Sequence, residues 1–424
     1  MQEIKATYRI VTPMFLGGAN QQPDDDIRPP SVKGALRFWW RALNWGKFRN
    51  TASCDETALI LLHNEEARLF GIAANDDEGG GQGCFLLRVQ HEKLTSTAKD
   101  QVHPRLKPTR QVQRNGRREI DQNHLGAARY LGYGLMVAFG KADGTKHSGQ
   151  LERGCLNENQ EFTVKLVFRN AIEPSVRESL IAWGLVGGLG SRSRHGMGSV
   201  ALISLEENNG TKKWTAPENT DDYDSKIKAL FSGPPLPNIE APFSAFWEGS
   251  RIDRLLSGID RFEVLNDFGS AMLMYRSWGR SSPGGGSTVL GSPSEQRFKD
   301  DHDWFKGIAG AAANPNFHPE RVVFGLPHNY HQTHHHVTSV EHERRSSPLL
   351  FHVHPVGDQF VGISVYLPAQ FLPNGEKIKA NGRPVPAVID WSIITCFLDG
   401  KVGKTTLPGA ADRFPSPGKM AVLP

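Results

Sequence analysis

The first 205 residues alternate between strand and helix patterns in a fixed order, and this order limits the folds open to the chain. Strand patterns occupy residues 4–12, 84–90, 161–168 and 199–205. Residues 32–45 and 175–189 instead repeat their apolar side chains at helical spacing, with Ser31 and Ser175 as expected N-caps. The order strand–helix–strand–strand–helix–strand predicts a split βαβ unit, with helices on only one face of its sheet.

A degenerate second copy of this unit is expected after the polar segment 206–243, which contains the turn-forming run GPPLP. A helix face runs from Val264 to Trp278, residues 321–324, 349–353 and 360–367 have strand patterns, and 388–398 are a candidate final helix. The predicted fold class is therefore α+β, with tandem ferredoxin-like (RRM-like) βαββαβ domains. We predict an N-terminal domain at 1–206, with an insertion at 91–158, and a C-terminal domain at 207–424.

Positive charge is concentrated in three stretches that contain no acidic residue. Residues 27–54 and 101–118 each carry six Lys or Arg, and residues 179–205 contain Arg192 and Arg194, although the net charge is only +4. Stretches of this kind are typical of phosphate-binding surfaces. The alternative for any one stretch is ordinary solvated surface.

The segment GGLGSRSRHGMGS, residues 187–199, is the most specific local signal. Five glycines in its first twelve residues permit positive φ angles and a close approach of the backbone to a ligand. Arg192, Arg194 and His195 supply phosphate donors. The run lacks GK[ST], and it follows a helix rather than a strand, so neither a P-loop nor a dinucleotide fingerprint fits.

Lys33, Arg37 and Arg41 are spaced four residues apart and form a basic stripe on the first predicted helix. We interpret them as phosphate contacts; the alternative is that Arg37 and Arg41 pair with carboxylates elsewhere in the fold. Trp39, Trp40 and Trp45 fit a packed core better than a base-stacking platform.

Four blocks of sequence together resemble a known family. They are FLGGANQQPDDDIRPPSVKGALRFWWRALNW, GLVGGLGSRSRHGMGSV, VVFGLPH and RRSSPLLFHV, spread from residue 15 to residue 353. This pattern is similar to the RAMP superfamily of CRISPR proteins, and within it to the family of first subunits of type III-B (Cmr) RNA-guided effectors.

The resemblance implies a tandem of RRM-like domains without catalysis of its own, acting in antiviral defence. It implies contacts with the 3′ region of the CRISPR RNA and with target RNA, and partners among other RAMP subunits of the Cmr complex. The RNA contacts carried over by motif are Arg28, Lys33, Arg37, Arg41, Gly187, Gly188, Gly190, Arg192, Arg194, Gly196 and Gly198. We add His195, which stands where a basic residue is common.

Arg344 and Arg345 are further expected RNA contacts, while Phe324, Leu326 and Leu350 are expected at the seam between the domains. The alternatives for the two arginines are a structural cap before a strand, or simple balance with Glu341 and Glu343.

Catalysis is the second hypothesis. His195 is a candidate general base for guide-processing RNA cleavage, and Asp24, Asp25 and Asp26 are candidates for metal-dependent target cleavage. For the three aspartates we favour the alternative of a solvated acidic loop whose charge helps to cap the following helix. Eight histidines lie between 328 and 354, but as a loop they predict only adventitious metal binding. We therefore expect no enzyme activity, no cofactor and no functional metal.

The chain has no run of 18 apolar residues, and its four cysteines form no CxxC pair. These features predict a cytoplasmic protein without a membrane partner.

Overall fold

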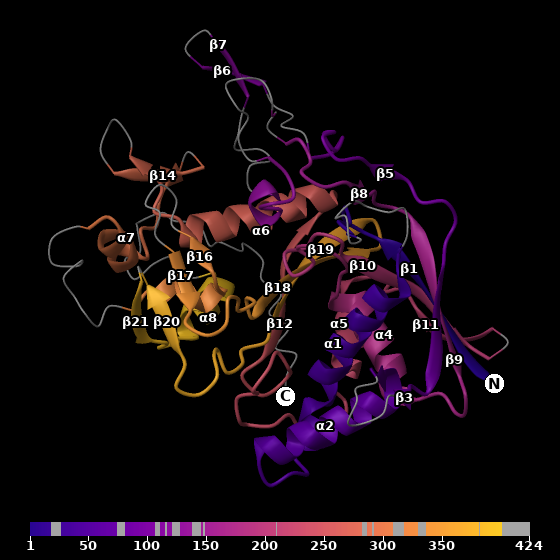
Figure 1. Ribbon diagram of the computed structural model, residues 1–424. Coiled ribbons are helices and arrows are strands. Elements are labelled where there is room, and N and C mark those ends of the chain that lie inside the picture. Colours follow the sequence, from indigo (N-terminus) through magenta and orange to yellow (C-terminus); the bar gives the residue numbers. More distant parts are fainter. Residues whose placement is uncertain are drawn as a thin grey trace.

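The computed structural model describes residues 1–17, 27–73, 81–106, 128–137, 146, 149–208, 210–281, 286–290, 292–307, 318–329, 336–380 and 382–400, and the backbone of 111–114 and 117–120. It has a mixed α/β architecture with antiparallel sheets (Figure 1). No described helix is long and apolar enough to cross a membrane.

A five-stranded antiparallel sheet forms the N-terminal part, in the order β11-β10-β1-β9-β4. Its strands are β1 (Gln2–Ile10), β4 (Phe85–Gln90), β9 (Glu161–Phe168), β10 (Val200–Glu207) and β11 (Thr211–Thr215). Helix α1 (Pro29–Arg49) follows β1, and α4 (Pro174–Val186) connects β9 to β10. The predicted order of strands and helices is confirmed in this part of the chain. The sequence interpretation gave no element at α2 (Asp55–Phe70), which packs beside α1.

The N-terminal core follows from the alternation in β1, whose Ile4, Ala6, Tyr8 and Ile10 are all fully buried. The hydroxyl of Tyr8 donates to the carbonyl of Leu180 in α4 at 2.9 Å, so its one polar atom is satisfied. The three tryptophans of α1 are also buried, as expected for core residues: Trp39, Trp40 and Trp45.

Both predicted N-caps are wrong for the same reason. Helix α1 begins at Pro29 with Arg28 as N-cap, and α4 begins at Pro174 with Glu173 as N-cap. Proline lacks the N–H that the first helical positions leave unbonded, and its fixed φ suits them. Each helix therefore starts at the proline rather than after the serine.

The C-terminal part is built on a three-stranded sheet, β12-β19-β18, with α6 (Arg261–Arg276) against one face. Its strands are β12 (Arg251–Gly258), β18 (Leu349–Val356) and β19 (Gln359–Tyr366). Phe268 of α6 stacks on Phe351 of β18, with ring centroids 4.4 Å apart. The final helix α8 (Ser392–Leu398) is shorter than expected.

The strand expected at 321–324 is wrong, because this segment forms a 3-10 helix, η1 (Glu320–Phe324). The buried carboxylate of Asp301 accepts the backbone N–H groups of Glu320 and Arg321, at 2.9 and 3.1 Å. An acidic side chain on the first N–H groups stabilises a helical turn, which the four-residue apolar pattern does not reveal.

Smaller elements fill the connections. They are β2 (Gly71–Ile72), β3 (Gly81–Gln82), β5 (Ser96–Thr97), β6 (Gln111–Arg114), β7 (Arg117–Ile120), β8 (Cys155–Leu156), α5 (Thr220–Ala229), β13 (Arg280–Ser281), β14 (Ser287–Val289), β15 (Ser292–Pro293), α7 (Lys299–Phe305), β16 (His328–Asn329), β17 (His336–Ser339), β20 (Lys377–Ala380) and β21 (Arg383–Pro386). The insertion 91–158 is partly structured, as expected, since Leu131 and Leu135 are buried. The domain boundary at residue 206 stays a prediction; β11 beyond it still pairs with the first sheet.

We predict that Gly184→Ala in α4 destabilises the protein. The added Cβ would lie 2.3 Å from Cβ of Leu202 in β10, so helix and strand must separate. Overpacking of this kind costs about 3 kcal/mol, measured by denaturant unfolding.

The matched control is Gly34→Ala in α1, where the added Cβ meets no atom within 4 Å. That change should be neutral or stabilise by up to about 1 kcal/mol, because alanine favours the helix. Equal unfolding midpoints for the two variants would contradict the close packing of α4 on β10.

Candidate nucleic-acid interface

The glycine-rich segment forms a loop (residues 187–199, the glycine loop) between α4 and β10, and its backbone is held tightly. Gly190, Gly196 and Gly198 have φ of +91°, +81° and +64°. A Cβ on Gly190 would lie 2.5 Å from the carbonyl oxygen of Phe15, and one on Gly198 only 2.1 Å from that of Leu189. The close approach that requires glycine at these two positions is therefore to the chain itself. Contact of these glycines with a ligand stays a prediction.

The glycine loop also joins the two parts of the molecule. The backbone N–H of Phe351 in β18 donates to the carbonyl of Arg194 at 2.9 Å, and the N–H of Val353 donates to the hydroxyl of Ser199 at 3.2 Å. A guanidinium nitrogen of Arg194 donates to the carbonyl of Ser347 at 3.0 Å. The glycine loop thus lies along residues 347–353, which include the first half of β18, and we call this contact the seam.

The residues expected at the seam are buried, but they lie in different cores. Leu350 belongs to the N-terminal core, Phe324 packs with α6, and Leu326 packs near β17 and β20. The backbones of Leu326 and Arg345 exchange hydrogen bonds of 2.8 and 3.1 Å, which ties the FGLP segment to the two arginines.

Five arginines from three segments gather at the seam, and we call them the arginine cluster: Arg192, Arg194, Arg276, Arg344 and Arg345. Burial lowers the pKa of Arg194 to about 10, and the like charge of Arg345 adds to this. Burial also lowers the pKa of Arg192, with Arg344 contributing as a like charge. His195 lies close enough to Arg192, Arg194 and Arg276 to feel the charge of each.

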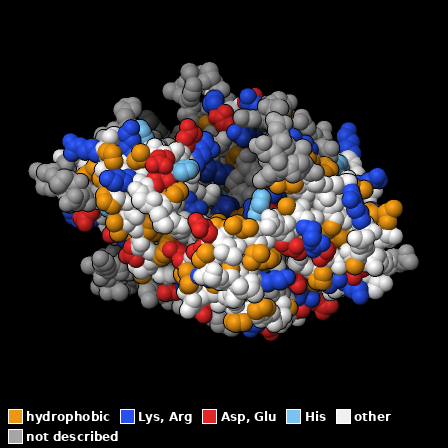
Figure 2. Space-filling model, turned by 60° about the horizontal axis from the view of Figure 1, so that its bottom comes forward, with side chains coloured by type: hydrophobic (Ala, Val, Ile, Leu, Met, Phe, Trp, Pro, Cys, Tyr) orange, Lys and Arg blue, Asp and Glu red, His pale blue; other side chains and the backbone are white. Residues whose placement is uncertain are grey.

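No described carboxylate forms an ion pair with any member of the arginine cluster. Arg192 donates to the carbonyl of Tyr133 at 2.9 Å. Arg276 lies 4.6 Å from the ring centroid of Phe324, and one of its terminal nitrogens lies 3.4 Å from Nδ1 of His328. Within the described chain, Nε of Arg276 and Nε of Arg345 are buried and have no hydrogen-bond partner. Figure 2 shows a hollow in one face with Lys and Arg side chains gathered in it. Closely spaced, partly buried arginines of this kind give the surface a strongly positive potential.

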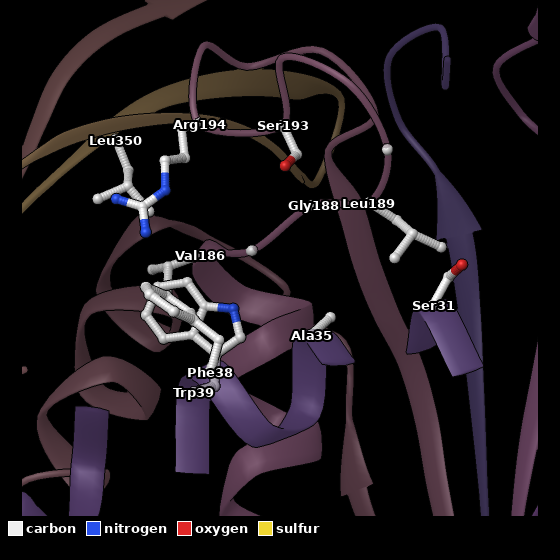
Figure 3. A pocket seen from close by; sticks show the side chains of 12 residues that line it. Ser31, Ala35, Phe38, Trp39, Val186, Gly188, Leu189, Ser193, Arg194 and Leu350 are labelled. Atoms are coloured by element: carbon white, nitrogen blue, oxygen red, sulfur yellow. The ribbon is translucent and has the colours of Figure 1, made fainter. Parts of the chain in front are cut away.

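Two adjoining cavities lie between the glycine loop and the start of α1. The first, the loop pocket, has a volume of about 230 Å³ and is lined by Phe38 and Trp39 of α1, by Gly187–Gly190 and by Arg194 (Figure 3). The second, about 370 Å³, shares Ser31, Leu189 and Gly190 with it and adds Arg153.

Two of the three residues in the basic stripe of α1 form ion pairs within the protein. Nε of Arg37 lies 2.5 Å and a terminal nitrogen of Arg41 2.7 Å from the same carboxylate oxygen of Glu66 in α2, whose side chain is only 4% exposed. The alternative of pairing with a carboxylate elsewhere therefore holds for both arginines, and their RNA contacts stay a prediction. Lys33 has its pKa lowered by burial and by Arg37. Arg28 is exposed and donates to the carbonyl of Gly17 at 3.0 Å.

The structure places the remaining predicted site residues in different environments. Asp24–Asp26 lie outside the described residues. His195 has its pKa lowered to about 3, first by burial and then by the neighbouring arginines, and its Nδ1 has no described partner. Arg344 is exposed, whereas Arg345 is partly buried and donates to the carbonyl of Gln370 at 3.1 Å; neither has a described ion pair with Glu341 or Glu343.

The histidine-rich segment brings three metal-capable groups together at Glu341, His342 and Glu376. The carboxylate of Glu376 is already engaged, because it accepts hydrogen bonds from the hydroxyl of Ser339 and the backbone N–H groups of Glu341 and His342. These contacts satisfy the buried carboxylate of Glu376.

Three residues of this region were not predicted from the sequence: Arg153, Arg276 and Phe38. Arg276 is the last residue of α6, and no motif around it indicates a binding site. Arg153 lies in the predicted insertion. Phe38 carried a weak signal, since it directly precedes the two tryptophans in a strongly basic helix.

Comparison with known proteins now defines the class. A sequence model described as the RAMP superfamily matches residues 7–201. The resemblance to this family is confirmed over these residues. Sequence comparison with curated proteins finds no significant match.

The fold is similar to that of a particular CRISPR protein over nearly its whole length. The crystal structure of Cmr1 from Pyrococcus furiosus matches with a TM-score of 0.53 and 17% identity, covering 93% of this chain and 97% of that chain. A chain in the cryo-EM structure of the type III-B Cmr-beta complex bound to cognate target RNA matches with a TM-score of 0.47 and 13% identity, covering 93% and 98%.

We predict that Arg37→Ala with Arg41→Ala lowers the free energy of unfolding by about 2 to 3 kcal/mol. The change strands the buried carboxylate of Glu66, and breaking a fully buried pair costs about 3–5 kcal/mol. We expect less here, since both arginines are 35% exposed. Denaturant unfolding measures the loss.

Adding Glu66→Met to the double variant should recover most of that loss, because no carboxylate then remains unpaired. Lys33→Ala is the control and should change stability by less than about 0.5 kcal/mol. A double variant as stable as the wild type would show that the ion pair does not support α1 on α2.

Proposed function

We propose that this protein is a non-catalytic, RNA-binding subunit of a type III-B CRISPR effector complex. The observation that carries the proposal is the arginine cluster, whose charges converge on the glycine loop of a RAMP-superfamily domain without a described carboxylate partner. RNA phosphates are the anions that such a surface recruits, and release of their counterions drives association.

The proposal includes a tandem ferredoxin-like architecture. The N-terminal sheet order β10-β1-β9-β4, with α1 and α4 as connections, supports it. The C-terminal part supports it with β12, α6, β18, β19 and α8, in an order that matches the first five elements of the same unit. In this arrangement the glycine loop precedes the last strand of the first unit and meets β18 of the second.

The proposed partners are the 3′ region of a CRISPR RNA, its paired target RNA and other RAMP subunits in the cytoplasm. Similarity to Cmr1 in fold supports this assignment. Of the residues named from the sequence, the exposed Arg192 and Arg344 are the strongest candidates for direct phosphate contact.

Catalysis through His195 is disfavoured by its environment. A general base at neutral pH works best with a pKa near 7 and within reach of its substrate. The pKa of His195 is lowered to about 3 by burial and by neighbouring arginines, which makes it a weak base.

Incubation of the purified chain with labelled guide and target RNA, with and without Mg²⁺, tests both functions. We expect binding without cleavage in either condition. Cleavage that needs Mg²⁺ and disappears on Asp24→Ala, Asp25→Ala or Asp26→Ala would overturn the non-catalytic assignment. Metal-independent cleavage lost on His195→Gln would do the same.

We predict that Arg192→Gln with Arg344→Gln weakens RNA binding and reduces its salt dependence. Each single-strand phosphate contact contributes about 0.7 to the slope of log affinity against log salt, so the slope should fall by about 1.4. Fluorescence anisotropy across a salt series measures it.

The matched control replaces two exposed arginines on distant elements, Arg88 of β4 and Arg383 of β21, by Gln. This control removes the same net charge and should leave the slope nearly unchanged. Equal slopes for the two double variants would assign the binding to general charge rather than to the arginine cluster.

A further inference from the structure

The loop pocket combines apolar walls with unused polar groups. Phe38, Trp39, Val186 and Leu350 supply the walls, and Arg194 points towards the two aromatic rings from the glycine loop (Figure 3). The rings of Phe38 and Trp39 meet edge to face, with centroids 5.1 Å apart, and the guanidinium carbon of Arg194 lies 5.0 Å from the centroid of Phe38.

The polar groups at this pocket keep hydrogen-bonding capacity. The hydroxyls of Ser31 and Ser193 and the indole nitrogen of Trp39 have no hydrogen-bond partner among the described residues. An apolar slot edged by donors and acceptors suits a flat heteroaromatic ring with polar atoms on its rim.

The volume of the loop pocket limits the size of the ligand group that it can hold. Its volume of about 230 Å³ is below the roughly 300–1,000 Å³ of pockets for drug-sized ligands. A single nucleobase fits this scale. Proteins that bind single-stranded RNA commonly place unstacked bases against aromatic rings or Arg guanidinium planes.

The adjoining cavity offers a place for the backbone of the same nucleotide. It continues from the loop pocket through Ser31, Leu189 and Gly190 to Arg153, which has no described ion pair. It also borders the start of α1, whose first turn contains no acidic residue. A phosphate there would meet the side chain of Arg153 and the positive end of a helix.

We propose that the loop pocket holds one unstacked base of single-stranded RNA, with the neighbouring phosphate in the adjoining cavity at Arg153. This inference rests on the proposed RNA-binding function and adds a base-binding site to it. The arginine cluster continues the phosphate path, because Arg194 belongs to both the cluster and the pocket.

The test is a coupling experiment with the full chain. The Ala35→Phe variant fills the loop pocket from α1, and binding is measured to a mixed-sequence single-stranded RNA and to a sugar–phosphate oligomer of equal length without bases. Ala35→Phe should weaken binding of the RNA roughly tenfold, the contribution of one stacked base. It should leave binding of the abasic oligomer unchanged.

Gly34→Phe is the matched control, because it adds the same side chain at the preceding position, where no atom lies within 4 Å of the added Cβ. It should leave both affinities unchanged. If Ala35→Phe fails to fold, Phe38→Leu removes the ring while keeping an apolar side chain, and the same loss confined to the RNA is expected.

The outcomes separate the two proposals. Equal weakening of both oligomers, or of neither, would overturn the base site while RNA binding stands. Failure of the wild-type chain to bind either oligomer at low salt would overturn the proposed function itself.

Discussion

The backbone hydrogen bond from Phe351 to the carbonyl of Arg194 is the contact on which the rest of the candidate interface depends. It fixes the glycine loop of the first sheet to β18 of the second, across 157 residues of sequence. Like charges as close as those of Arg192, Arg344, Arg194 and Arg345 repel each other, and exposed side chains alone would move apart. The seam keeps these arginines together. Its backbone hydrogen bonds and the apolar residues buried beside it stabilise the arrangement against that repulsion.

The order of elements in the N-terminal part could be predicted from periodicity alone, since alternating burial in β1 and helical burial in α1 are local patterns. The first residue of each helix was harder to predict, because α1 begins at Pro29 and α4 at Pro174, ahead of the serines expected as N-caps. The 3-10 helix at 320–324 depends on the carboxylate of Asp301, about 20 residues away, and no local pattern contains that information. Long-range partners of this kind set the limit of sequence interpretation here.

The charged residues of the candidate site were also hard to predict, because their partners lie far away in the sequence. Arg37 and Arg41 lie in an acid-free stretch, yet their partner Glu66 follows on the next helix, and packing of α1 on α2 brings it within 2.7 Å. Arg192 also lies in an acid-free stretch and Arg344 directly follows Glu343, yet neither forms an ion pair with a described carboxylate. Counting charge along the sequence therefore identifies candidate phosphate contacts, but only tertiary packing separates neutralised arginines from those that remain available. Arg276 and Arg153 join the site solely through packing.

The unbalanced arginine cluster and the constrained glycine loop have a joint consequence for binding. The glycines at 190 and 198 approach the chain's own carbonyls, so the loop is already constrained before any ligand binds. In the proposed complex, less conformational entropy would be lost on association, and the overall affinity would be correspondingly higher. Phosphates bound as proposed would also relieve the repulsion among the arginines of the cluster. Because a ligand that binds only the folded state stabilises it, the proposed RNA ligand, bound across the seam, would also stabilise the association of the two sheets.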